Sequence, residues 1–271
     1  MSTTVRGVQE VLRRCREEGR AALIGYLPVG FPTVDGSIEA MRVLVDAGCD
    51  VVEVGVPYSD PLMDGPVIQH AAATALAGGT HVDDVFLATA AVREAGGSPL
   101  VMTYWNLVLR RGVARFAADL AASGGAGLIT PDLIPEEAED WIAASDEHGL
   151  DRVFLVAPSS TPERLVKVTR ATRGFVYAAS TMGVTGARTS VDSHARDLVE
   201  RTRAVTDLPV CVGLGVSTGA QAAELAAYAD GVIVGSALVR TLTGDGELGD
   251  RLDALRALTA ELADGVRTGA R

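Results

Sequence analysis

Lysine is nearly missing from this chain: Lys167 is the single one in 271 residues. Schiff-base aldolases and pyridoxal phosphate enzymes need a lysine in their site. Lys167 falls in a helical segment after the fifth predicted strand, which is the wrong place for such a residue. Carbon–carbon chemistry on this chain would therefore use carboxylates rather than an imine.

Cysteine and histidine are also scarce, with three and four residues, and neither forms a spaced motif. The sequence therefore predicts no metal site and no disulfide framework, which fits a reducing compartment. No apolar run approaches the length of a membrane span, and the formal net charge of −11 disfavours nucleic-acid or anionic-membrane surfaces. We expect a soluble cytoplasmic protein.

Aromatic residues make up only 4% of the chain, so aliphatic side chains must form most of the core. Eight short apolar runs alternate with amphipathic stretches that have helical periodicity. The runs are 22–27, 51–56, 100–103, 127–130, 153–156, 175–178, 210–212 and 232–234. This alternation predicts an α/β fold, a single-domain (β/α)8 TIM barrel over residues 1–271. An open doubly wound sheet is the alternative fold.

The predicted barrel core covers about 22–240 and follows an N-terminal helix. An insertion follows the second strand, because that βα unit is about twice the usual length. A C-terminal helix is expected at about 246–263, with a frayed tail at 264–271.

Three acidic residues lie on or just after the second predicted strand. Glu53 is within a valine-rich run, and Asp60 and Asp64 are in the loop that follows. A carboxylate buried there must be paired, protonated or functional, and two such groups could divide acid and base roles. The alternatives are a structural glutamate bonded to a neighbouring strand and two ordinary turn aspartates.

Glycine gathers after the last three predicted strands, at 183–186, 213–215 and 235. Loops after barrel strands seven and eight form a recurrent phosphate site, where backbone N–H groups approach the oxygens. The alternative is that these glycines only permit tight turns. The sixth loop, 180–190, is long and is similar to a lid over a ligand.

Five ordered segments resemble the tryptophan synthase α subunit family: 52–66, 102–106, 130–135, 183–188 and 213–217. The resemblance implies reversible retro-aldol cleavage of indole-3-glycerol phosphate to indole and glyceraldehyde 3-phosphate. It also implies an α2β2 complex, in which indole passes to a β subunit that carries pyridoxal phosphate. No cofactor is implied on this chain.

The same resemblance assigns roles to individual residues. Glu53 and Asp64 match the catalytic pair, with Glu53 moving protons and Asp64 holding the indole N–H. Asp60 falls near the contact with the β subunit. The other implied substrate contacts are Tyr26, Met102, Ile129 and Leu155 in the indole slot, Tyr177 and Thr185, which touch substrate and orient the aspartate, and Gly186, Gly213, Gly215, Gly235 and Ser236 in the phosphate cradle.

Two other functions stay open from the residues alone. Another phosphate-binding barrel enzyme, such as a sugar-phosphate isomerase or epimerase, would need an acid–base pair but no indole slot. A non-catalytic regulatory subunit could bind phosphate and tune a partner, although Glu53 and Asp64 together disfavour it.

Overall fold

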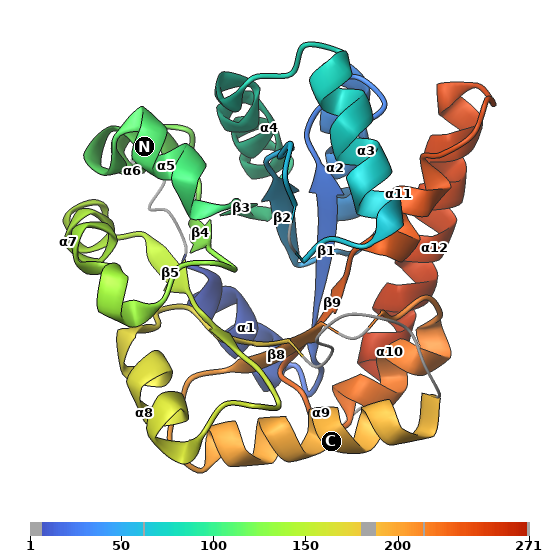
Figure 1. The fold of residues 1–271 in the computed structure, drawn as a ribbon. Coiled ribbons are helices and arrows are strands. Elements are labelled where there is room, and N and C mark those ends of the chain that lie inside the picture. Colours follow the sequence, from blue (N-terminus) through green and yellow to red (C-terminus); the bar gives the residue numbers. More distant parts are fainter. Residues whose placement is uncertain (1–6, 62, 180–187, 214, 270–271) are drawn as a thin grey trace.

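A ring of parallel strands forms the centre of the computed structural model, which describes residues 7–61, 63–179, 188–213 and 215–269 (Figure 1). The sheet order is β5-β4-β3-β2-β1-β9-β8-β7-β6, and all pairs are parallel. The strands are β1 Ala22–Pro28, β2 Val51–Gly55, β3 Ser98–Met102, β4 Gly127–Ile129, β5 Asp151–Val153, β6 Leu155–Val156, β7 Val176–Ala179, β8 Val210–Gly213 and β9 Gly231–Val234. The predicted TIM barrel is confirmed.

The barrel closes through its fifth unit, where the sequence predicted one strand and the structure has two. β5 pairs with β4, and β6 pairs with β7, with Phe154 between the two short strands. The backbone N–H of Tyr177 donates to the carbonyl of Phe154 at 3.1 Å. The same segment thus bonds to both neighbours, and the ladder changes partner at Phe154.

Helices surround the ring. They are α1 Val8–Glu17, α2 Val34–Asp46, α3 Pro66–Ala77, α4 Val82–Glu94, α5 Trp105–Arg111, α6 Val113–Ala122, η1 Pro135–Glu137, α7 Glu139–His148, α8 Pro162–Ala171, α9 Arg188–Arg203, α10 Gly219–Ala226, α11 Ser236–Thr241 and α12 Leu248–Thr268. Thr33, Thr161 and Thr218 cap α2, α8 and α10 by accepting a backbone N–H from the first turn. The predicted insertion after β2 contains α3 and α4. No helix in the described ranges is long and apolar enough to cross a membrane.

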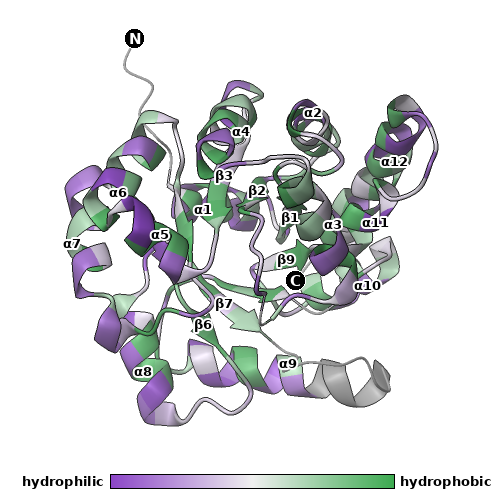
Figure 2. Cartoon of the chain, turned by 45° about the horizontal axis from the view of Figure 1, so that its top comes forward, coloured by the Kyte–Doolittle hydropathy of each residue, from purple (hydrophilic) through white to green (hydrophobic). Residues whose placement is uncertain are grey.

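Strand alternation sorts the side chains into two hydrophobic layers. Val52 and Val54 of β2 pack outward with the helices, whereas Val51 belongs to the layer inside the ring. Figure 2 shows green hydrophobic strands at the centre and helices whose purple hydrophilic surfaces lie on the periphery. Because side chains two apart share a face, Glu53 lies on the inner row with Val51.

Helix α1 closes the amino-terminal end of the ring. Four of its side chains join the inner hydrophobic layer: Val8, Val11, Leu12 and Cys15. The backbone N–H of Val8 donates to the Asp151 carboxylate at 2.7 Å, across 143 residues of sequence. The first N–H groups of a helix have no partner within the helix. The Asp151 side chain accepts one of them in α1, as an N-cap side chain does in other helices.

The C-terminal helix is longer than the sequence predicted, so the expected tail from residue 264 is wrong. α12 runs to Thr268, and Val266 is only 1% exposed. A Cβ on Gly265 would lie 2.2 Å from the carbonyl oxygen of Gly219 at the start of α10. Gly265 therefore allows α12 and the start of α10 to approach closely, because it carries no side chain.

Candidate active site

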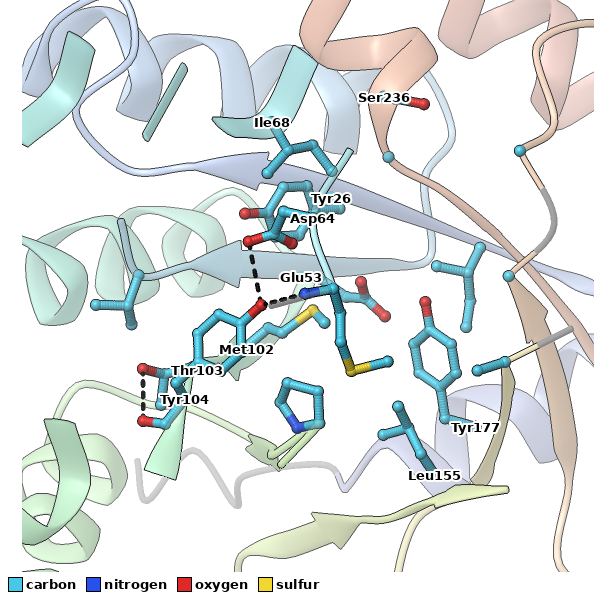
Figure 3. Close-up of a pocket in the computed structure, with 18 residues that line it drawn as sticks. Tyr26, Glu53, Asp64, Ile68, Met102, Thr103, Tyr104, Leu155, Tyr177 and Ser236 are labelled. Carbon is cyan, nitrogen blue, oxygen red and sulfur yellow. Dashed lines mark hydrogen bonds between the residues drawn. The ribbon is translucent and has the colours of Figure 1, made fainter. Parts of the chain in front are cut away.

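A cavity of about 210 Å³ opens at the carboxyl ends of the strands (Figure 3). This is the end at which barrel enzymes place their catalytic groups. Ten predicted site residues line it: Tyr26, Glu53, Asp64, Met102, Leu155, Tyr177, Gly213, Gly215, Gly235 and Ser236. Six of these ten residues lie on six different strands, and the other four follow β2, β8 or β9 in the chain.

Glu53 presents a buried carboxyl group to this cavity. Its side chain is 1% exposed, and Oε1 has no hydrogen-bond partner within the described part of the chain. Burial raises the pKa of Glu53 from 4.5 to about 8. The carboxyl group is therefore mainly protonated at neutral pH, and its Oε1 is not tied to a neighbouring strand as the structural alternative required.

Asp64 lies in the loop after β2 and is partly buried. The Tyr104 hydroxyl donates to its Oδ2 at 3.4 Å, and Gln69 Nε2 donates to its backbone carbonyl at 2.8 Å. Burial raises the pKa of Asp64, while the hydrogen bond from Tyr104 acts in the opposite direction. The two carboxyl groups thus occupy different environments, as a division of acid and base roles requires.

Two tyrosines enter the cavity, each across a glycine of the next strand. A Cβ on Gly55 would lie 2.5 Å from the ring of Tyr26, and a Cβ on Gly213 would lie 2.7 Å from the Tyr177 hydroxyl. No real Cβ makes contacts this short, so each ring depends on its glycine. Burial is the main cause that raises the pKa of both tyrosines, and the Glu53 carboxylate adds to it. Both phenols are therefore neutral hydrogen-bonding groups at neutral pH.

Three glycines and a serine line the cavity where β8 and β9 end. Gly213 ends β8, Gly215 has a positive φ of 58°, and Gly235 precedes Ser236 at the start of α11. In Figure 3, Ser236 lies apart from Glu53 and Asp64, on the α11 side of the cavity. Backbone at this end can approach an anionic group closely because the glycines carry no side chain.

Four predicted site residues lie elsewhere or outside the described residues. Ile129 is fully buried in the inner hydrophobic layer and does not line the cavity, which corrects its expected place in the slot. Asp60 is exposed in the loop after β2, where its carboxylate accepts from the Ser59 hydroxyl. Thr185 and Gly186 lie outside the described residues, as does most of the predicted lid at 180–190.

Sequence reasoning missed eight residues that line the cavity: Val56, Met63, Ile68, Thr103, Tyr104, Pro131, Ala179 and Ile233. Alternation offered a signal for one of them. Tyr104 lies two residues after Met102, which is the last residue of β3. A side chain that continues the inner row of a barrel strand is expected at the cavity mouth.

A parallel barrel that gathers two carboxyl groups, three tyrosines and a glycine-lined end around one cavity defines an acid–base enzyme for a small molecule. The family model of the tryptophan synthase alpha chain matches residues 12–267. The chain belongs to this family, which is the lyase component of tryptophan synthase in tryptophan biosynthesis.

Individual relatives agree with the family match. The tryptophan synthase alpha chain of Mycobacterium marinum is 66% identical over 93% of this chain and 92% of its own. A structure of Mycobacterium tuberculosis tryptophan synthase is 62% identical, covers 96% of this chain and 98% of that chain, and has a TM-score of 0.90. The alpha subunit of Legionella pneumophila, at 30% identity, still gives a TM-score of 0.85 over 96% and 97% of the two chains.

Proposed function

We propose that the chain cleaves indole-3-glycerol phosphate reversibly to indole and glyceraldehyde 3-phosphate. The observation that carries this proposal is the buried, mainly protonated Glu53, which lines the same cavity as the partly buried Asp64. A retro-aldol step on indole needs both a proton donor at C3 and an anion that accepts the ring N–H. Family membership supports this reaction over a sugar-phosphate isomerase or a non-catalytic subunit.

In the proposed mechanism Glu53 first acts as an acid. Its proton goes to indole C3, and the ring nitrogen gains positive charge that Asp64 stabilises through the N–H. The Glu53 carboxylate then takes the proton of the glycerol hydroxyl that flanks the scissile bond. The carbon–carbon bond breaks, its electron pair returns to the indole ring, and the aldehyde forms. A pKa near 8 suits a group that gives and takes one proton near neutral pH.

Binding is divided between the two ends of the cavity. We assign the phosphate to the glycine-lined end, at Gly213, Gly215, Gly235 and Ser236. Gly186 belongs to the same proposed cradle, as the sequence motif implies.

The indole ring would lie in a slot at the end of the cavity that holds the Glu53 and Asp64 side chains. Tyr26, Met102 and Leu155 line the cavity there, and their apolar surface suits an aromatic ring. Tyr177 and Thr185 would contact the substrate and orient Asp64.

We further propose that the chain works in an α2β2 complex in the cytoplasm. Solved relatives are whole tryptophan synthases, which supports a β subunit as the partner. Pyridoxal phosphate would be held by that β subunit, and indole would pass to it from this cavity. Asp60 is exposed on the loop beside the cavity and is available for the contact.

The test is release of indole from indole-3-glycerol phosphate by the purified chain, alone and with a tryptophan synthase β subunit. We expect measurable release by the chain alone and faster release in the complex. A sugar phosphate offered as substrate should give no isomer. Turnover of the sugar phosphate without indole release would contradict the proposal.

A further inference from the structure

The hydroxyl group of Tyr104 joins two neighbouring residues of the loop after β2. It donates to Asp64 Oδ2 at 3.4 Å and accepts the backbone N–H of Met63 at 3.1 Å. Figure 3 shows the two bonds converging on this one oxygen. Tyr104 lies two residues beyond β3, directly before α5, so a neighbouring βα unit supports a loop that has no regular structure of its own in its described residues.

The ring that carries this hydroxyl is itself held in place. Tyr104 is 6% exposed, and its ring stacks on Tyr58 with centroids 4.7 Å apart and an interplanar angle of 29°. Tyr104 also immediately precedes α5, whose first residue, Trp105, donates its backbone N–H to the Asp132 carboxylate at 2.9 Å. A hydroxyl fixed by stacking and by a helix start is preorganised, so it can fix what it binds.

We propose that Tyr104 is a positioning residue for the cleavage, which holds Asp64 in the cavity by binding both its carboxylate and the backbone before it. This inference depends on the proposed function, because it gives Asp64 its orientation toward the indole N–H. The Tyr104 hydroxyl is bonded to this loop at two points, the Asp64 carboxylate and the Met63 N–H. A bond to the carboxylate alone would fix one rotamer, whereas the bond to Met63 also fixes the loop.

The charges around Asp64 make this bond matter. Among the described residues, Tyr26 of β1 and Tyr177 of β7 interact electrostatically with Asp64, Tyr104 is hydrogen-bonded to it, and Glu53 of β2 lines the same cavity. None of these four supplies a positive charge. Hydrogen bonding from Tyr104 therefore favours the ionised carboxylate against the effect of burial.

The experiment compares Tyr104→Phe with Tyr58→Phe. Each variant removes one hydroxyl from the same ring pair and keeps the stack, but only Tyr104 is hydrogen-bonded to Asp64 in the structure. We expect Tyr104→Phe to lower kcat about tenfold, close to the lower limit for hydrogen bonds to charged groups, with KM changed less than about twofold. Tyr58→Phe should stay within about twofold of the wild type in both constants.

A second measurement does not depend on turnover. The full chain labelled with 13C-aspartate is titrated by NMR, and the Asp64 signal is assigned with Asp64→Asn. The pKa of Asp64 should be higher in Tyr104→Phe than in the wild type and unchanged in Tyr58→Phe. An unchanged Asp64 titration in Tyr104→Phe overturns the proposal, as does a kcat no lower than that of Tyr58→Phe.

The two measurements separate this proposal from the proposed function. If the wild-type chain releases no indole, the proposed function fails, and the part of Tyr104 in cleavage fails with it. The titration would then still report whether the hydroxyl supports the carboxylate. If the wild type releases indole and the Asp64 titration is insensitive to Tyr104, only the positioning role is lost.

Discussion

Replacing Glu53 by glutamine separates its cost to stability from its use in catalysis. Glutamine has nearly the same shape but neither gains nor loses a proton near neutral pH. The wild-type side chain is 1% exposed and has a pKa of about 8, against 4.5 for an ordinary glutamate. At neutral pH the Glu53 carboxyl group is therefore protonated in the folded chain but ionised in the unfolded chain, so folding requires the uptake of a proton.

The size and sign of this effect follow from the two pKa values. Below pH 4.5 the carboxyl group is protonated in both states, and the stability associated with the neutral group is fully present. Between 4.5 and about 8 only the unfolded chain ionises, so the free energy of unfolding falls as pH rises. The difference in pKa corresponds to about 5 kcal/mol, at about 1.4 kcal/mol per pKa unit.

The assay is urea unfolding of the wild type and Glu53→Gln at several pH values from 5 to 9. The variant should gain stability relative to the wild type as pH rises, by about 4 kcal/mol across this range, since it lacks the titrating group. Indole release by the same variant should fall to nearly nothing, while a phosphate analogue still binds. The matched control is Glu39→Gln on the outer helix α2, which should be neutral in both assays.

Two results would refute this reasoning. Parallel stability curves for the wild type and Glu53→Gln would mean that Glu53 titrates near its ordinary value in the folded chain. Near-normal indole release by the variant would remove Glu53 from the chemistry. Gain of stability together with loss of cleavage is the pattern expected of a group placed for catalysis at the expense of folding.

Three further substitutions test the packing around the site and at the C-terminus. Gly213→Ala should raise KM about tenfold, because the new Cβ would displace the Tyr177 hydroxyl, and unchanged steady-state kinetics would contradict this. Gly55→Ala should lower kcat/KM by a similar factor of about ten through displacement of the Tyr26 ring, with normal folding checked by circular dichroism. Val266→Ala should lower the free energy of unfolding by about 2 kcal/mol, as a buried core position does, whereas a frayed tail would give no change.

The barrel was predictable because its signal is repeated in every unit. Apolar runs and helical stretches alternate throughout, so an error at one strand leaves the fold unchanged. The split at Phe154 was not visible, since a change of hydrogen-bonding partner leaves the apolar pattern intact. The end of α12 was missed because the last residues of a chain were expected to fray, and the sequence does not show that Gly265 packs closely against the start of α10.

A site residue could be predicted where a polar or charged side chain occurs within an apolar run of the sequence. Glu53 stands out in a valine-rich strand, and its place in the cavity follows from strand alternation. Ile129 gave no such conflict, and its depth inside the ring depends on the register between strands, which one sequence does not reveal. Tyr104 was missed because its two bonds join residues that are 40 and 41 positions apart in the sequence.

The hydrogen bond between Val8 and Asp151 bears on how substrate and product reach and leave the cavity. α1 covers the amino-terminal end of the barrel, and its buried side chains pack against the hydrophobic layer inside the ring. The cavity beside Glu53 is lined by residues at the carboxyl ends of the strands, so we expect substrate to enter and product to leave at that end. A second subunit seated at that end would therefore control arrival and departure at once.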